Sequence, residues 1–290
     1  MDKLVFGVTD NSLMQSYAQR GMRVIEQKCR GIKCMAKELR AKEGNEQEAV
    51  IKALHRREVD IAAFELWELD RFISGRDAGL TIAAFVRDVD DRYVLMTRRK
   101  SSKHFASAVV EVCDSESGFQ LADRFDGVLC VTGVGGALVQ IDRLSKEKCH
   151  GVLLPAAQVI NLGSHKNLNY RYNYLDRETV TPHMGRGIIA LVCRQDLKCI
   201  NELAKVSAAN VIKKLEIERT ISFKIDEAVR ESRENCQYSV CAQIIRGKFK
   251  VIVYLRRKNA GRHFIRGGSY SDKEKIIADT IDEIIKYLED

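Results

Sequence analysis

The chain has 290 residues, 45% of them hydrophobic and 30% charged, which is enough apolar material for two or three domains with cores of their own. No apolar run approaches the roughly 18 residues of a membrane span, and residues 1–7 begin on a strand pattern instead of a signal peptide. We therefore expect a soluble, cytoplasmic protein with no membrane partner. The net charge of +8 and the pI near 9.0 favour an acidic partner. Because the sequence has no arginine-rich arm, zinc finger or aromatic RNA-binding signature, we do not expect nucleic acid.

The nine cysteines are an odd number and are scattered along the chain. Their nearest spacings are Cys29/Cys34, Cys193/Cys199 and Cys236/Cys241. None of these is the two-residue spacing of a zinc knuckle. The cysteines therefore predict reduced thiols in a reducing compartment and no metal site.

The first 85 residues alternate between strand and helix patterns. The expected segments are, in order, a strand at 4–8, a helix at 13–29, a strand at 32–35, a helix at 46–57 and strands at 60–64 and 80–85. Asn11 or Ser12 can cap the first helix. Such alternation predicts a mostly parallel sheet whose ligands bind beyond the carboxyl ends of the strands. Residues 10–12 and 64–68 are therefore expected on the same rim.

A second alternating unit follows from about residue 87 to residue 174. Its expected strands lie at 93–96, 108–112, 127–131 and 151–154, and one of its helices lies at 136–146. Residues 132–136 form a glycine-rich turn between a strand and a helix, where backbone N–H groups can hold an anion. The spacing is wrong for a dinucleotide fingerprint. This turn is either a tight connection or an anion cradle.

The last part of the chain centres on a cysteine. A helix at 208–215 is followed by the polar residues 233–239, a strand at 249–255 and a terminal helix at 272–288. Cys236 precedes two alternating apolar segments, so we expect it at the lip of a small sheet domain, facing outward. The alternative is an ordinary reduced cysteine, since free cysteines are usually buried small hydrophobes.

Two stretches resemble one enzyme family. Cys236-Gln237, followed by a strand pair with Gly247, resembles the Gly-Gly-Cys-Gln-Val-Pro-Ile-Gly loop of hydroxymethylbilane synthases (porphobilinogen deaminases), which carries their covalent dipyrromethane cofactor. Residues 181–194 resemble the family's Leu-Pro-Ala-Val-Gly-Gln-Gly-Ala-Val-Gly-Ile-Glu-Cys-Arg, which returns to complete the first domain. Shorter resemblances at 60–62, 87–92 and 218–219 follow in the same order, so the match covers essentially the whole chain.

The resemblance implies an α/β protein of three domains and a monomer. Domain 1 would comprise residues 1–85 and 181–197 and domain 2 residues 86–180, both doubly wound and periplasmic-binding-protein-like. Domain 3, residues 198–290, would be a small α+β domain carrying the cysteine loop.

The family joins four porphobilinogen units, each bearing two carboxylates, into a linear tetrapyrrole with loss of ammonia. By resemblance, Cys236 would anchor the dipyrromethane and Glu68 would be the catalytic carboxylate facing the cationic azafulvene-like intermediate. Ser12 and Arg186 would bind the polycarboxylate substrate. A solvated turn residue is the other interpretation of Glu68.

Several family positions are changed. The family's Thr-Arg-Lys-Ser is Thr-Asp-Asn-Ser at 9–12, its Ser-Ser-Leu-Arg-Arg is Cys-Asp-Ser-Glu-Ser at 113–117, and Val134 stands near an expected arginine. Glu68 is one methylene longer than the family's aspartate, and both loop glycines are replaced, by Glu234 and Asn235. The basic run at 98–100 is a solvated surface or a compensating cluster.

These changes leave alternatives open. The chain is either a tetrapyrrole-forming enzyme or a non-catalytic relative that binds a tetrapyrrole or another small anion in the inherited fold. A regulatory or partner-binding role is a third hypothesis, with no motif behind it. Cys241 competes with Cys236 as the reactive thiol.

Overall fold

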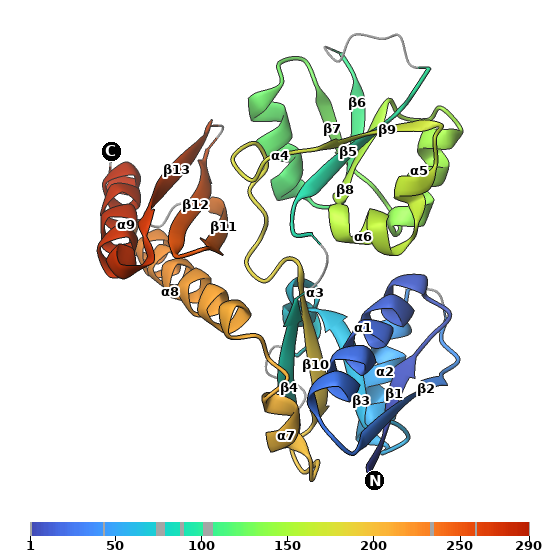
Figure 1. Cartoon of the computed structure of the whole chain (residues 1–290). Coiled ribbons are helices and arrows are strands. Elements are labelled where there is room, and N and C mark those ends of the chain that lie inside the picture. Colours follow the sequence, from blue (N-terminus) through green and yellow to red (C-terminus); the bar gives the residue numbers. More distant parts are fainter. Residues whose placement is uncertain are drawn as a thin grey trace. The chain divides into compact units, whose positions relative to one another are not determined.

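The computed structural model describes residues 2–42, 44–73, 79–87, 90–100, 107–232, 235–258 and 260–289. They form two compact units, one of Met1–Val89 with Gly185–Ile212 and one of Asp90–Met184 with Lys213–Asp290 (Figure 1). Strands and helices alternate in the first unit and in much of the second, which confirms the predicted α/β class. The finer division into three domains stays a prediction. The expected contributions of residues 88, 233 and 234 lie outside the described residues.

The first unit contains a five-stranded sheet in the order β2-β1-β3-β10-β4. β1 runs parallel to β2 and β3, whereas β10 runs antiparallel to both β3 and β4. The strands are β1 (Asp2–Val8), β2 (Ile32–Glu38), β3 (Ile61–Glu65), β4 (Leu80–Arg87) and β10 (Ile188–Arg194). The helices are α1 (Ser12–Lys28), α2 (Glu46–His55), α3 (Leu66–Ile73) and α7 (Ile200–Ala204).

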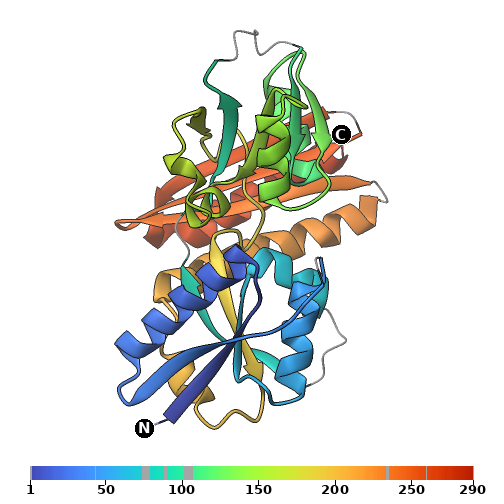
Figure 2. The same cartoon turned by 90° about the vertical axis from the view of Figure 1, so that its right-hand side faces the viewer.

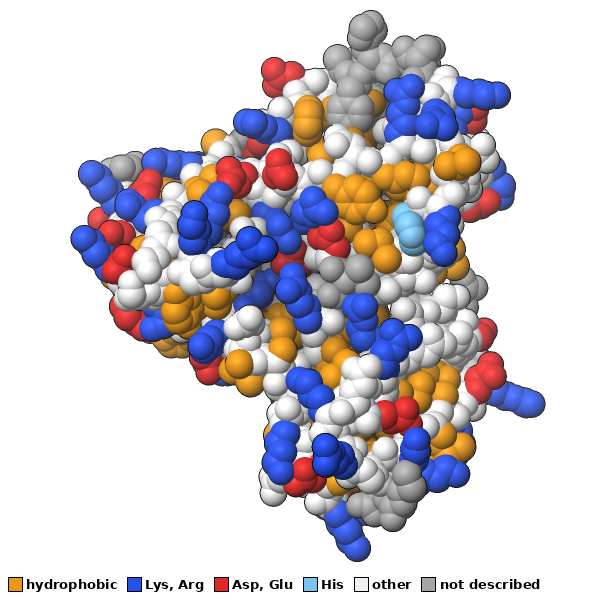
Figure 3. All heavy atoms as spheres, viewed as in Figure 1, with side chains coloured by type: hydrophobic (Ala, Val, Ile, Leu, Met, Phe, Trp, Pro, Cys, Tyr) orange, Lys and Arg blue, Asp and Glu red, His pale blue; other side chains and the backbone are white. Residues whose placement is uncertain are grey.

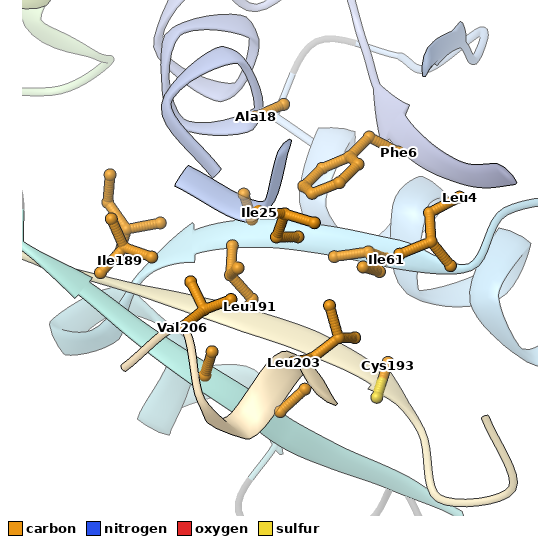
Figure 4. Close-up of a cluster of buried hydrophobic side chains, with 14 of the residues drawn as sticks. Leu4, Phe6, Ala18, Ile25, Ile61, Ile189, Leu191, Cys193, Leu203 and Val206 are labelled. Carbon is orange, nitrogen blue, oxygen red and sulfur yellow. The ribbon is translucent and has the colours of Figure 1, made fainter. Parts of the chain in front are cut away.

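Helices cover both faces of this sheet, as a doubly wound fold requires. Figure 2 shows α1 and α2 on opposite faces. On the α1 side, Phe6, Ile25 and Leu191 are buried in one cluster together with residues of α7, and Figure 4 shows these side chains meeting above β3 and β10. On the other side, α2 and α3 pack in a second cluster. β10 is buried on both faces, which explains why residues 188–193 are continuously apolar.

The cap of α1 is Asn11, one of the two residues that the sequence allowed. Its Oδ1 accepts hydrogen bonds from the backbone N–H groups of Leu13 (3.0 Å) and Met14 (3.2 Å). We expect Asn11→Ala to lower the free energy of unfolding by about 1 kcal/mol. Urea unfolding followed by the fluorescence of Trp67, the only tryptophan, measures the change. Ser12→Ala is the control, and an equal loss in both variants would contradict the capping assignment.

The second unit begins with a mixed five-stranded sheet in the order β7-β6-β8-β5-β9. β6 runs parallel to β7 and β8, and β5 runs antiparallel to β8 and β9. The strands are β5 (Tyr93–Arg98), β6 (Val109–Val112), β7 (Leu129–Thr132), β8 (Gly151–Pro155) and β9 (Tyr170–Tyr174); the helices are α4 (Ser115–Arg124), α5 (Ala137–Ser145), α6 (Ala156–Asn161) and the 3-10 turn η1 (Ser164–Lys166). The edge strand β9 was not predicted, because its three tyrosines are only half-buried.

The rest of the second unit is an antiparallel sheet, β11-β12-β13, with two helices. Its elements are α8 (Ala209–Ser232), β11 (Cys236–Ile245), β12 (Lys248–Arg257), β13 (Ala260–Ser269), η2 (Tyr270–Asp272) and α9 (Lys273–Glu289). α8 is 24 residues long, so the predicted end at residue 215 was wrong. Ile217, Ile221 and Ile225 continue a buried stripe at every fourth position and join α8 to the core beneath β11–β13.

Basic charge is concentrated in the three-stranded sheet. Residues 235–271 contain eight of the 48 Lys and Arg residues and none of the 40 Asp and Glu residues. Its acidic partners come from elsewhere in the unit: Asp123 pairs with Arg256, Glu178 with Lys250, and Glu283 with Arg262 and Arg266. Many of the blue side chains in Figure 3 lie over the part that β11–β13, α8 and α9 occupy in Figure 1.

No described helix combines the length and the hydropathy needed to cross a bilayer.

Candidate functional site

The candidate site of the first unit is the rim where β1 and β3 end and β10 begins. β1 and β3 are parallel and β10 is antiparallel to β3, so residues 9–12, 65–68 and 185–187 come to one edge of the sheet. The predicted meeting of residues 10–12 and 64–68 at one rim is therefore confirmed by the topology.

Glu68 lies in the first turn of α3, which follows β3 without a loop. Its side chain is half-buried, and its Oε2 accepts a hydrogen bond from the Nε2 of Gln47 on α2 at 3.0 Å. A carboxylate in the first turn is also favoured by the helix dipole. A side chain on a neighbouring helix therefore orients the partly exposed carboxylate of Glu68.

Arg186 is only 3% exposed, and its guanidinium is engaged within the first unit. Its Nη1 donates to the Oε2 of the fully buried Glu65 at 3.1 Å, and the backbone N–H of Gly187 donates to the Oε1 of Glu65 at 3.3 Å. The guanidinium carbon lies 5.6 Å from the centre of the Trp67 ring. Arg186 thus binds Glu65 and packs against Trp67 in the first turn of α3, the turn that contains Glu68.

The backbone around Arg186 depends on glycine. Gly185 and Gly187 have φ angles of 79° and 72°, in the left-handed region that other residues rarely adopt. A Cβ atom on Gly185 would also lie 3.1 Å from the side chain of Leu66. The backbone conformations of Gly185 and Gly187 direct the side chain of Arg186 toward Glu65 at the end of β3.

Ser12 is the first residue of α1 and its side chain is exposed. The cap is Asn11, so the hydroxyl group of Ser12 is not used for capping and lies at the positive end of a 17-residue helix. This is a suitable place for a carboxylate of a ligand.

The second unit has a buried polar cluster at the carboxyl end of β6. Asp114 caps α4 by accepting the backbone N–H of Ser117 on its Oδ1 at 2.7 Å. Its Oδ2 accepts from the hydroxyl group of Tyr93 and from the thiol of Cys113, both at 3.0 Å. The Nε2 of His183 lies 3.2 Å from Oδ1. These contacts surround an acidic group at a position where the resembling family has serine.

The glycine-rich turn between β7 and α5 is closely packed against its own helix. A Cβ atom on Gly133 would lie 2.6 Å from the amide nitrogen of Gln140, and Gly135 has a φ angle of 96°. Gly136 caps α5 without a side chain. The close approach at Gly133 and the positive φ angle of Gly135 explain why these two positions are glycine. The glycines of this turn can therefore be explained without an anion-binding role.

Cys236 is the first residue of β11, directly at the start of the strand and not in a preceding loop. It is half-buried and packs against the core between the sheet and its two helices, whereas we expected it to face outward. The reason is that successive residues of a strand point to opposite faces, and Cys236 shares a face with the buried Val240 and Ala242.

A cavity of about 220 Å³ lies beside the cysteine. It is lined by Asn235 and Gln237, the two neighbours of Cys236 in the chain, and by Phe119, Arg256 and Lys258. The guanidinium carbon of Arg256 lies 4.5 Å from the centre of the Phe119 ring. This cavity offers two cations, two amides and an aromatic surface, which suits an acidic ring.

Cys241, the competing thiol, is fully buried in the second unit. Burial raises the pKa of its thiol to about 12, since nearby Lys214 only partly opposes the effect. A thiol of this kind is an inert core residue.

Alkylation of the native protein should therefore separate the two thiols. In protein from cells that make no porphobilinogen, in which Cys236 carries no adduct, we expect iodoacetamide to modify Cys236 and to leave Cys241 unmodified until denaturant is added, because only a thiolate in contact with solvent reacts. Peptide mass spectrometry after timed quenching measures both rates, with the buried Cys193 as a second unreactive reference. Equal rates at Cys236 and Cys241 would contradict the burial of Cys241.

The basic run at 98–100 lies on the surface of the second unit. Arg98 pairs with Glu147, and Arg99 and Lys100 are exposed. The solvated-surface interpretation describes it well.

Comparison with known proteins agrees with the resemblance. The family model described as porphobilinogen deaminase, dipyromethane cofactor binding domain, matches residues 11–202, which is more than half of the chain. The chain belongs to the porphobilinogen deaminase family. The matched residues include Ser12, Glu68 and Arg186 and end before Cys236.

Two relatives show how distant the family members are. The porphobilinogen deaminase of Clostridium novyi (strain NT) is 30% identical over 87 residues, which are 30% of this chain and 29% of that protein. The porphobilinogen deaminase of Staphylococcus aureus (strain JH9) is 24% identical over 176 residues, 60% of this chain and 56% of that protein. The chain thus spans between about a third and about half of the length of these relatives.

Among solved structures, the periplasmic VFT2 domain of Bordetella pertussis BvgS has a TM-score of 0.46 at 16% identity, covering 70% of this chain and 86% of that chain. The methionine-binding protein MetQ has a TM-score of 0.44 at 13% identity, covering 70% and 89%. Neither similarity adds to the family assignment.

Sequence reasoning did not identify Gln47, Tyr93 and His183 as members of these clusters, and it placed Glu65 on the rim without its buried partner. Glu65 ends an apolar strand, and its burial follows from Arg186, which lies 121 positions away. His183 lies within the segment that resembles the family, but nothing in the sequence indicated that it contacts Asp114. Tyr93 lies within a strand pattern that marked it only as a core residue, and Gln47 lies within the expected helix at 46–57.

Proposed function

We propose that this member of the porphobilinogen deaminase family joins four porphobilinogen units into the linear tetrapyrrole hydroxymethylbilane, releasing ammonia. The observation that supports it most is Glu68, a carboxylate oriented at the strand ends of the matched region by Gln47. Each condensation breaks the bond between carbon and the amino group and forms a carbon–carbon bond. Ammonia leaves, the pyrrole carbon that forms the new bond loses a proton, and one water supplies the hydroxyl group of the released product.

Glu68 would act on the substrate. As the amino group leaves, positive charge develops on the pyrrole, and an oriented carboxylate stabilises that charge most when it is held in place before the reaction. The same carboxylate can accept the proton that the pyrrole carbon loses. The hydrogen bond from Gln47 and the packing of Trp67 against Arg186 hold the turn that carries it.

The residues near Cys236 are of chemical types that can bind the dipyrromethane of the family. The thiol would form the thioether, and Arg256, Lys258, Asn235 and Gln237 of the adjoining cavity would hold carboxylates of the group. When bound, dipyrromethane supplies the pyrrole carbon onto which the first substrate is added. The half-buried thiol has to remain accessible from the end of β11 for this attachment.

Substrate carboxylates are assigned to Ser12 at the start of α1. A substrate contact from Arg186 would require its guanidinium to leave Glu65. In the described geometry Arg186 instead holds Trp67 and, through the turn, Glu68.

The first test is the intact mass of the freshly expressed protein with a peptide map. We expect an adduct of the mass of dipyrromethane on the peptide of Cys236, absent in Cys236→Ser. An unmodified thiol, in cells that make porphobilinogen and with substrate added, would reject the enzyme and leave a protein that binds a tetrapyrrole or another small anion.

Turnover of porphobilinogen tests Glu68 separately. We expect Glu68→Gln to lower kcat by about 10²–10³, the usual cost of removing one charge-stabilising group. Glu48→Gln, an exposed glutamate on α2 paired with Lys52, is the matched control. Equal turnover in the Glu68→Gln and Glu48→Gln variants would remove Glu68 from the mechanism.

A further inference from the structure

Three side chains of the second unit bring potential metal ligands together. One carboxylate oxygen each of Asp114 and Glu116 and one ring nitrogen of His183 all lie within 4.8 Å of one another. Asp114 and Glu116 flank the start of α4, and His183 comes from the segment that follows β9. Nothing in the proposed reaction uses this trio.

The distances are close to those around a bound ion. Ligand atoms about 2.0–2.2 Å from a zinc ion lie about 3.3–4.4 Å from each other. The Nε2 of His183 and the Oδ1 of Asp114 are 3.2 Å apart. The carboxylate oxygen of Glu116 lies within 4.8 Å of both, so its side chain has to move inward to complete the set. Asp114 and His183 are 7% and 5% exposed, so an ion here would be shielded from water on most sides.

The second ring nitrogen of His183 is in contact with a hydroxyl group, which orients the ring. Its Nδ1 lies 3.4 Å from the hydroxyl group of Ser239 on β11, and the amide nitrogen of Gln120 on α4 donates to the same hydroxyl at 3.4 Å. Gln120 also binds the backbone of Thr181 twice, accepting its N–H at 2.6 Å and donating to its carbonyl at 3.1 Å. A metal-binding histidine usually has its second nitrogen fixed in this way.

The charged groups around this cluster are mainly negative, which favours the binding of a cation. The N-terminus of α4 carries partial positive charge, but Asp114 already neutralises it by capping Ser117. Tyr93 and Cys113 donate to the other oxygen of Asp114. Glu116 adds a second negative charge within 4.8 Å.

We propose that Asp114, Glu116 and His183 bind one divalent transition-metal cation of the zinc type. Two carboxylate oxygens and an imidazole nitrogen suit such an ion better than Mg²⁺, which prefers oxygen ligands alone. On binding, the proton of His183 lies on Nδ1 and is donated to Ser239, while the lone pair of Nε2 binds the metal. Three protein ligands leave a coordination position for water.

Zinc titration of the full chain tests this site. After treatment with a chelator, the protein is titrated with Zn²⁺ in competition with a chromophoric chelator, and bound metal is counted by mass spectrometry after desalting. We expect one Zn²⁺ per chain and at least tenfold weaker binding in His183→Gln and Glu116→Gln, with about tenfold weaker binding in Ser239→Ala. His55→Gln is the control that should bind as the parent protein does.

Because Asp114 also caps a helix, Glu116→Gln is the deciding variant. Its partner Ser115 is on the surface, so the fold should persist, and circular dichroism checks this. Unchanged zinc affinity in Glu116→Gln and His183→Gln overturns the proposal. The Co²⁺-loaded protein gives a second readout, since a sulfur-to-cobalt charge-transfer band would show that cysteines bind the metal instead. Neither readout depends on porphobilinogen turnover, so this site and the proposed function fail or succeed separately.

Discussion

Arg186→Met is expected to lower the free energy of unfolding of the first unit by about 3–5 kcal/mol. Arg186 and Glu65 are 3% and 0% exposed, and their ion pair of 3.1 Å is buried at the end of β3. Removing the guanidinium leaves the carboxylate of Glu65 in a place with little water. The unpaired charge, more than the lost contact, is the origin of the effect.

Fluorescence of Trp67 during urea unfolding reports this unit, since it is the only tryptophan and lies against Arg186. The control is Arg56→Met, because the side chain of Arg56 is 72% exposed. This substitution should change the free energy of unfolding by less than about 0.5 kcal/mol. The double variant Arg186→Met/Glu65→Leu should recover much of the loss, because both charges are then absent. Similar stabilities for Arg186→Met and Arg56→Met would mean that the pair is not buried in solution.

A second large loss, again about 3–5 kcal/mol, is expected for Lys214→Met in the second unit. The ammonium group of Lys214 lies 2.9 Å from Asp91 and 3.6 Å from Glu218. Glu218 is fully buried and also accepts the backbone N–H of Ala242 at 2.8 Å, and Asp91 pairs with Arg177. Lys214 thus links α8, β11 and the start of the unit.

Near-UV circular dichroism of the tyrosines measures this loss during urea unfolding. Lys224→Met is the matched control on α8, because the pair of Lys224 with Glu227 is half-exposed and contributes little. Equal midpoints for Lys214→Met and Lys224→Met would contradict the role of the network.

The same network sets a pH dependence. Burial raises the pKa of Asp91, but Lys214 and Arg177 outweigh it and hold the pKa below its ordinary value of 3.8. The stability that Asp91 contributes is therefore complete above pH 3.8 and is lost as the pH falls through its lower folded pKa. Lys214→Met removes one of the two cations, so its acid unfolding should begin at a higher pH than that of the parent protein.

The first unit could be predicted well because its signals are local. Apolar strands alternate with amphipathic helices up to residue 87, and each of the expected segments is present, with ends that differ by a few residues. The second unit was harder. α8 has a long polar surface that hides its buried stripe, and β9 presents half-buried tyrosines at a sheet edge.

The candidate site was predicted only in part, since its contacts join distant positions. Glu68 was identified by resemblance, and its orienting partner Gln47 was not. Arg186 was expected to reach a substrate, but a glycine on each side and the buried Glu65 turn it inward. Local patterns contain no information about a partner 121 positions away. Cys236 was expected on a turn before the sheet, but it is the first residue of β11, and the phase of this strand determines which face it occupies.

The basic three-stranded sheet affects the molecule beyond its own contacts. Residues 235–271 hold eight Lys and Arg residues without an acid, so the remaining residues carry equal numbers of positive and negative side chains. The whole net charge of +8 therefore belongs to this one segment. Asp123, Glu178 and Glu283 pair with four of these eight cations. The segment therefore attracts a polyanion less strongly than the bare count of charges implies, and added salt weakens that attraction further.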